Sequence, residues 1–277
     1  MLSRRTGLSF VLAAALLSGA GTASADGQGY APAYAAPALF SWTGFYVGAN
    51  VGGAWGAFDV DTVANPAFFA GAGPDTLTSL HRDGSPTFSP SSFVGGGQLG
   101  YNWQMSNVVV GLETDIQGWN LRESHNTGVL PTPPLSPGLG AYQFAESASS
   151  SWLWTLRGRT GLAFGNGLAY VTGGLAVADH SFSQSYFFFI PAAGGGGSAS
   201  TDQAGWTIGG GLEYALRSNW TVKAEYLYVD LGSQSFGSNV AGYPAATFHH
   251  EDTLTANIVR IGINYKFGSR DEYAPLK

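Results

Sequence analysis

The chain has 277 residues, no cysteine and a formal net charge of −6, and only 11% of its residues are charged. Soluble globular proteins carry about 25% charged residues, so this composition disfavours an ordinary cytoplasmic enzyme. The acidic balance argues against nucleic-acid binding, and the lack of cysteine excludes disulfides and thiolate metal sites.

The N-terminus has the layout of a secretory signal peptide. Arg4 and Arg5 form a basic start, residues 8–17 are apolar, and Ala-Ser-Ala at 23–25 is a cleavage motif. We therefore expect residues 1–25 to be removed after export. No later stretch has the about 20 consecutive apolar residues that a transmembrane helix needs, so a membrane-spanning fold would have to be a closed barrel.

A leader rich in alanine and proline is expected at 26–41, and from Trp42 onward the pattern changes to the two-residue period of β-strands. Eight segments follow it, each long enough for the about 9–11 residues of a membrane strand. They are Thr43–Phe58, Ser92–Gln104, Val108–Leu121, Ser151–Phe164, Leu168–Ser181, Ala204–Arg217, Trp220–Leu231 and Thr253–Phe267.

The connections alternate between short and long. Short turns are expected at 105–107, 165–167 and 218–219, and long loops at 59–91, 122–150, 182–203 and 232–252. Short turns on one side and long loops on the other are typical of outer-membrane barrels. The sequence therefore predicts an all-β fold, a transmembrane eight-stranded antiparallel up-and-down barrel over 42–267. Four long loops face outward, three short turns face the periplasm, and a periplasmic tail follows at 268–277.

One face of most segments is apolar and the opposite face is charged, which indicates lipid outside and a polar lumen. Strand 168–181 is the ambiguous one. The predicted lumen carries an ion-pair network of four acids and five bases, because a buried charge without a partner is costly. Its members are Glu113, Asp115, Arg157, Arg159, Glu213, Lys223, Glu225, Arg260 and Lys266. Three interpretations stay open: a rigid plug, a narrow or gated ion pathway, and a catalytic carboxylate pair.

Aromatic residues are expected to form two girdles at the membrane interfaces. Near the short turns we place Phe45, Trp103, Phe164, Tyr170, Trp220, Tyr265 and Phe267. Toward the long loops we place Trp55, Phe93, Trp152, Trp206 and Tyr228.

Three segments resemble a known family. WTGFYVG at Trp42–Gly48, YVTGGLA at Tyr170–Ala176 and VRIGINYKF at Val259–Phe267 look like the first, fifth and last strands of the small outer-membrane β-barrels of alphaproteobacteria. Members of that "porin family" include outer membrane immunogenic proteins and other surface antigens, and the architecture also resembles OmpA and OmpX. The family usually ends at the terminal phenylalanine, whereas here Gly268–Lys277 follow Phe267.

A metal is not expected, and His249 and His250 are only weak candidates because neighbouring residues rarely converge on one ion. We expect no cofactor and no enzymatic activity. The first functional hypothesis is a structural and surface-interaction protein of the cell outer membrane. Its partners would be membrane lipid and lipopolysaccharide, the barrel-assembly machinery, and an extracellular ligand or host surface bound by the loops. A low-conductance channel and a lipid A-modifying enzyme are the alternatives.

Overall fold

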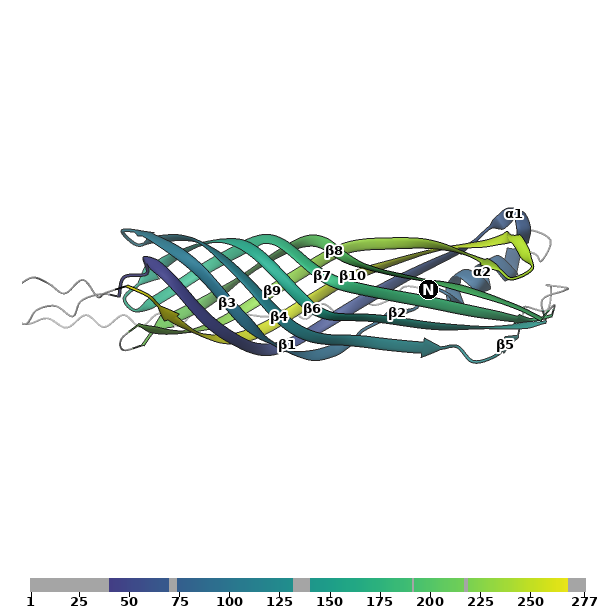
Figure 1. Cartoon of the computed structure of the whole chain (residues 1–277), viewed down its shortest axis with the longest axis horizontal. Helices are drawn as coiled ribbons and strands as arrows, with labels where there is room; N and C mark the ends of the chain where they lie inside the picture. Colours follow the sequence, from purple (N-terminus) through teal and green to yellow (C-terminus); the bar gives the residue numbers. More distant parts are fainter. Residues whose placement is uncertain (1–39, 70–73, 132–139, 191, 217–218, 269–277) are drawn as a thin grey trace, which may run out of the picture. The chain divides into compact units, whose positions relative to one another are not determined.

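The computed structural model describes residues 40–69, 74–131, 140–190, 192–216 and 219–268 (Figure 1). The expected signal peptide, nearly all of the leader and the tail after Gly268 lie outside the described residues. Within the described part, no helix is both long enough and apolar enough to cross a membrane.

Eight long antiparallel strands close into a ring (Figure 1), each paired with the next and β10 paired with β1. They are β1 (Gly44–Ala64), β3 (Ser91–Met105), β4 (Val108–Asn126), β6 (Ala141–Phe164), β7 (Gly167–Phe189), β8 (Ala192–Ala215), β9 (Trp220–Val240) and β10 (Tyr243–Lys266). The predicted eight-stranded ring is confirmed. Two strands of two residues each, β2 (Thr87–Phe88) and β5 (Leu130–Pro131), attach to β1 and β6, so the described sheet has ten strands in all.

The connection between β1 and β3 holds two helices, α1 (Pro66–Phe69) and α2 (Pro74–Asp83). Leu80 of α2 is fully buried and belongs to a cluster with Tyr142 and Phe144 of β6. The Tyr142 hydroxyl donates to Asp83 Oδ2 over 2.6 Å, which ties the end of α2 to the inner face of the sheet.

The strands extend well beyond the segments that the sequence predicted. Six of the eight run for 21 to 24 residues, about twice what a membrane strand requires. Most of the residues assigned to loops 182–203 and 232–252 are therefore in strands, and the connections there shrink to 190–191 and 241–242. The prediction of the loop bounds was wrong because it took serine and glycine as loop signals, whereas the two-residue alternation continues through them.

Along the strands, the apolar side chains change from the outer face of the wall to its inner face. In the half of β10 near the short turns, Val259 and Ile261 point outward and Arg260 inward. In the other half Leu254 is buried inside, and Glu251 is exposed outside. We call the part between the short turns and the outward Trp55, Trp152, Trp206 and Tyr228 the lower barrel, and the part beyond it the outer barrel.

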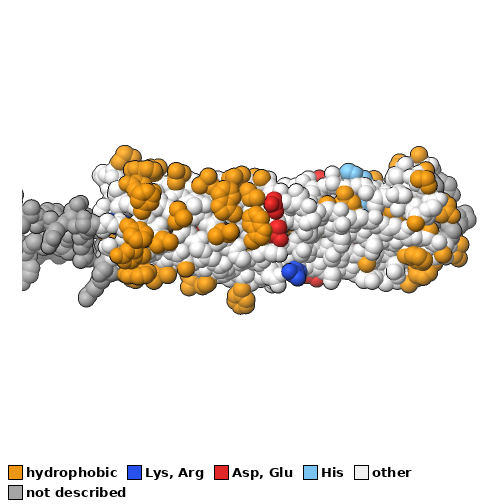
Figure 2. Space-filling view, viewed as in Figure 1, with side chains coloured by type: hydrophobic (Ala, Val, Ile, Leu, Met, Phe, Trp, Pro, Cys, Tyr) orange, Lys and Arg blue, Asp and Glu red, His pale blue; other side chains and the backbone are white. Residues whose placement is uncertain are grey.

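Figure 2 shows this change on one face: hydrophobic side chains cover the lower barrel, a few charged side chains follow, and a mostly uncharged polar wall comes next. Inside the outer barrel lies an apolar layer like the core of a soluble protein. Its members are Ala54, Phe58, Val60, Phe88, Val94, Trp119, Leu121, Ala148, Leu153, Ala176, Ala178, Phe182, Leu227, Val229, Leu231, Leu254, Ala256 and Ile258.

Register shifts mark the level where the faces exchange. They lie between Gly118 and Leu121 of β4, between Ser149 and Leu153 of β6, and opposite Thr253–Thr255 of β10. In β6 the shift is held by Asp179 of β7, whose Oδ1 accepts hydrogen bonds from the backbone amides of Ser151 and Trp152 over 2.7 and 2.9 Å. β-Bulges bend a strand and change the direction in which its side chains point. Such a change is needed where the apolar side chains move from the outer to the inner face.

Candidate functional site

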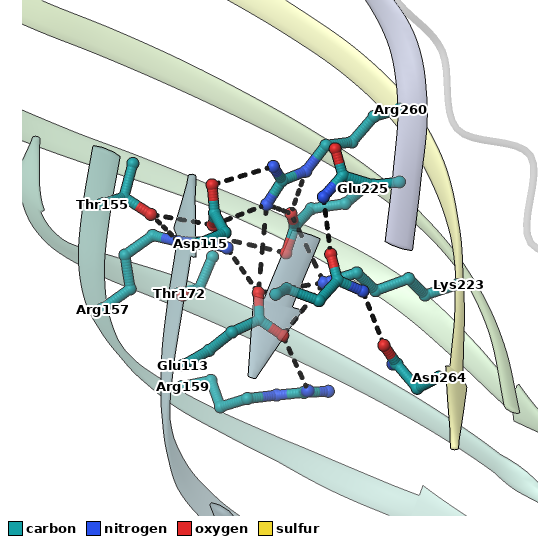
Figure 3. Close-up of polar contacts among 12 residues, drawn as sticks. Glu113, Asp115, Thr155, Arg157, Arg159, Thr172, Lys223, Glu225, Arg260 and Asn264 are labelled. Atoms are coloured by element: carbon teal, nitrogen blue, oxygen red, sulfur yellow. Dashed lines mark hydrogen bonds and ion pairs between the residues drawn. The ribbon is translucent and has the colours of Figure 1, made fainter. Parts of the chain in front are cut away.

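Charged side chains from five strands meet inside the lower barrel (Figure 3). Arg157 of β6 lies at their centre. Its guanidinium contacts Glu113, lies 2.7 Å from Asp115 Oδ2 and lies 3.1 Å from Glu225 Oε1. The inward face of a strand presents every second residue, so Glu113 and Asp115 reach the lumen together, as do Arg157 and Arg159.

Two further bases complete the centre of the network. Arg260 Nη2 lies 2.6 Å from Glu225 Oε2 and 3.0 Å from Asp115 Oδ2. Lys223 Nζ lies 2.9 Å from Glu113 Oε1. Every one of these side chains is almost fully buried, so each charge depends on its partners for stabilisation.

The network is electrically balanced. Four acids (Glu113, Asp115, Glu213, Glu225) face four bases (Arg157, Arg159, Lys223, Arg260). The sequence placed Lys266 there too, but Lys266 Nζ instead donates to the Thr43 carbonyl at the base of the barrel over 3.0 Å. Lys266 is the last residue of β10.

Arg159 is held by aromatic rings that the sequence did not assign to the lumen. Its Nη2 lies 2.7 Å from Glu213 Oε2, and its guanidinium lies 4.0 Å from the ring centroid of Tyr170. Tyr170 was predicted to be a girdle residue, and this was wrong: it is buried, and its hydroxyl donates to Glu225 Oε1 over 2.9 Å. On the other side the Tyr46 hydroxyl donates to Glu113 Oε2 over 2.8 Å.

A chain of amides extends the network toward β1 and β10. Asn50 Nδ2 donates to Gln98 Oε1 over 2.7 Å, Gln98 Nε2 donates to Asn264 Oδ1 over 2.6 Å, and Asn264 Nδ2 donates to Glu213 Oε1 over 2.8 Å. None of these three amides was predicted from the sequence as a site residue. Their alternation with outward apolar residues is the signal that could have found them.

Most predicted girdle residues lie on the outer wall. Those with exposed side chains are Phe45, Trp55, Phe93, Trp103, Phe164, Trp206, Trp220 and Phe267, while Trp152, Tyr228 and Tyr265 are half-buried. Ring pairs link neighbouring strands within this wall, such as Trp206 with Tyr228 at 5.5 Å and Trp220 with Tyr265 at 5.2 Å between centroids.

The weak metal candidates do not converge. His250 points inward and is buried, whereas His249 points outward and is exposed. Among the described residues, no group of three or more His, Cys, Asp or Glu side chains is placed to hold a metal ion.

One serine contacts a histidine inside the outer barrel. Ser238 Oγ lies 2.7 Å from His250 Nε2, and Thr62 Oγ1 lies 3.1 Å from His250 Nδ1. Burial lowers the pKa of His250 to about 4, which makes it a poor base at neutral pH. The contact is therefore suited to packing the interior rather than to activating Ser238 as a nucleophile.

Glu146, which is buried in the outer barrel, should make stability depend on pH. Its Oε1 accepts from Gln184 Nε2 over 2.6 Å, and burial raises the pKa of Glu146 to about 7 from its ordinary value of 4.5. A carboxyl whose pKa is raised by folding stabilises the fold below the unfolded value, and that contribution is lost as pH rises through the folded value. We therefore expect Glu146 to remove on the order of 2–3 kcal/mol of stability as pH rises from about 4.5 to 7, and little more above pH 7.

In thermal unfolding followed by circular dichroism, the stability of the wild type relative to Glu146→Gln should therefore fall between about pH 4.5 and 7. The His250 contribution has the opposite sign in the same window, but both proteins carry it, so the difference between their profiles isolates Glu146. Parallel profiles for the wild type and Glu146→Gln would show that Glu146 is not the group responsible.

The family model described as "Outer membrane protein beta-barrel domain" matches residues 10–267. The "31 kDa outer-membrane immunogenic protein" of Brucella melitensis biotype 1 is 34% identical over 239 residues, covering 86% of this chain and 88% of the relative. The "22 kDa outer membrane protein" of Rhizobium leguminosarum bv. viciae is 29% identical, covering 62% and 66%. Among solved structures, OprG from Pseudomonas aeruginosa aligns with a TM-score of 0.40 and 12% identity, covering 82% of this chain and 97% of that one.

Proposed function

Because this chain belongs to the outer membrane protein beta-barrel domain family, and is therefore an outer-membrane protein, we propose that it is a sealed, non-enzymatic surface protein. The lower barrel anchors it in lipid, and the outer barrel presents the connections of β1–β3, β4–β6, β7–β8 and β9–β10 to the exterior. A surface-antigen role is in keeping with its 34% identical relative, which is named an immunogenic protein.

The observation that carries the proposal is the double closure of the lumen. The balanced ion-pair network fills the lower barrel, and the apolar layer around Phe58, Leu227 and Leu254 fills the outer barrel above it. An eight-stranded barrel has an interior just wide enough to be filled by side chains. An ion would have to break buried salt bridges and then cross an apolar layer, and both steps are costly.

Planar-bilayer recording of the purified full-length protein tests this proposal. We expect no steady, sized openings above the bare bilayer. An epitope tag after Gly242, in the outer connection, should be detected on intact cells, whereas the same tag after Asn166, in a short turn, should need permeabilised cells. These two tags test whether the protein used for the recordings inserts in the proposed orientation. Steady openings from protein that passes the tag test would contradict a sealed lumen and favour a channel.

A further inference from the structure

The wall of the outer barrel has a seam between β8 and β9 that is not hydrogen-bonded as a ladder. β8 and β9 pair at Gly195 with Val240 and again from Trp206 with Asp230, but 196–205 and 231–239 make no ladder pairs with each other. Elsewhere both segments pair normally, β8 with β7 and β9 with β10. Unpaired strand edges present free backbone donors and acceptors.

Exposure of an inward position shows that the seam is open to solvent. Thr201 of β8 lies directly opposite His180 of β7, which is fully buried, so Thr201 also points inward. Thr201 is nevertheless exposed. The interior of the outer barrel can therefore be reached from the side at this level.

Unpartnered polar atoms lie behind the opening. Gln234 of β9 is 9% exposed, and neither its Oε1 nor its Nε2 has a hydrogen-bond partner. Asp252 lies directly opposite on β10 and is fully buried; its Oδ2 lies 2.6 Å from His180 Nε2, while its Oδ1 has no partner. Buried polar atoms without partners are rare and point to a missing molecule that would satisfy them.

The unmet atoms define the chemistry of that molecule. They comprise two acceptors, Asp252 Oδ1 and Gln234 Oε1, and one donor, Gln234 Nε2. Residues opposite each other in a sheet have side chains about 5 Å apart, so a small group must offer at least two donors and one acceptor. Neighbouring hydroxyls on a sugar ring do so, because each hydroxyl both donates and accepts. A carboxylate oxygen disfavours phosphate and other anions.

The approach to the seam has matching chemistry. Outward serines lie opposite each other on neighbouring strands, with Ser181 and Ser200 Oγ atoms 2.8 Å apart and Ser147 and Ser183 Oγ atoms 2.9 Å apart. No charged residue occurs in β8 from Ala192 to Thr201. This hydroxyl-lined wall begins just above the outward aromatic residues of the lower barrel, where the sugars of surrounding lipopolysaccharide would lie.

We propose that the β8–β9 seam binds an uncharged sugar unit through neighbouring hydroxyls, with Gln234 and Asp252 as the hydrogen-bonding pair. This inference rests on the proposed exposure of the outer barrel and not on the sealing of the lumen, which bilayer recording tests separately. Two sources share this chemistry: the oligosaccharide of lipopolysaccharide in the same membrane and a free glycan outside the cell.

The test is a calorimetric titration of the full chain in phospholipid nanodiscs with dephosphorylated oligosaccharide released from lipopolysaccharide. We expect saturable binding that Gln234→Leu weakens at least tenfold. Ser235→Ala, the adjacent residue on the opposite face of β9, should stay within about twofold. Gln234→Leu removes an unpaired buried amide, so it should unfold at or above the wild-type temperature without sugar, which separates lost binding from lost fold.

Repeating the titration in nanodiscs with intact lipopolysaccharide or with lipid A alone separates the two sources. Intact lipopolysaccharide should reduce the apparent affinity if membrane sugars occupy the seam, and should leave it unchanged if the source is external. No saturable binding to the wild type up to about 10 mM would overturn the proposal and assign the unpaired atoms to bound water. Equal binding by Gln234→Leu would overturn it as well.

Discussion

Arg157→Leu should destabilise the barrel by about 3–5 kcal/mol, which is the usual cost of leaving a buried charge unpaired. Arg157 is completely buried and contacts Glu113, Asp115 and Glu225 at once. Its loss turns a balanced network into one with an excess negative charge. The measurement is urea unfolding in lipid vesicles, followed by tryptophan fluorescence and by heat-modifiable gel mobility.

A compensating variant makes this prediction specific. Adding Asp115→Asn restores three acids against three bases, so the double variant should recover at least half of the loss. Lys266→Leu removes a base that lies outside the network and should change stability by no more than about 1 kcal/mol. Strictly additive effects of Arg157→Leu and Asp115→Asn would contradict a network acting as one unit.

Arginine substitutions at three positions of β7 should have opposite outcomes. Val171 points outward in the lower barrel, Phe182 is buried inside the outer barrel, and Ser183 points outward there. Val171→Arg places a charge in hydrocarbon and should cost about 2–4 kcal/mol. Phe182→Arg buries a charge without a partner and should cost several kcal/mol more than a cavity alone. Ser183→Arg should be close to neutral.

The fraction of each variant that reaches the outer membrane in heat-modifiable form reports these effects. Ser183→Arg is the matched control, because it adds the same side chain to the same strand one residue away from Phe182. If Ser183→Arg were as damaging as Val171→Arg, lipid rather than solvent would cover the outer barrel, and the assignment of the two halves would be wrong.

The sequence allowed prediction of the strand number, the closed ring and the lipid-facing side of the lower barrel. These features depend on the alternation of apolar and charged residues along a single strand. That alternation is visible wherever one face is apolar and the other ionic, as in Val259–Lys266. Eight of the nine predicted lumen charges meet because parity along a strand fixes the face of each residue. Which of these charges pair across the lumen depends on the register between strands and on the closure of the ring. The sequence of a single strand shows neither.

The errors have equally local causes. Tyr170 lies in a strand with apolar residues on both faces, so alternation did not show which face it occupies. The outer barrel was taken as loops because its outward residues are serine, threonine and glycine. There the alternation persists with apolar residues inside, as in Phe182, Tyr186 and Phe188. Reading the two-residue period without assuming which face is apolar would have found these extensions.

The central claim is that the wall of this barrel exchanges its apolar face from outside to inside near Val177 and Asp179 of β7. The chain has no cysteine, so single cysteines can be spin-labelled at the outward positions 171, 175, 177, 179, 181, 183 and 185. In lipid vesicles we expect the labels up to 177 to collide mainly with dissolved oxygen, and those from 181 onward mainly with a water-soluble nickel chelate. Oxygen-dominated collisions through 185, or chelate-dominated collisions already at 171, would contradict the account.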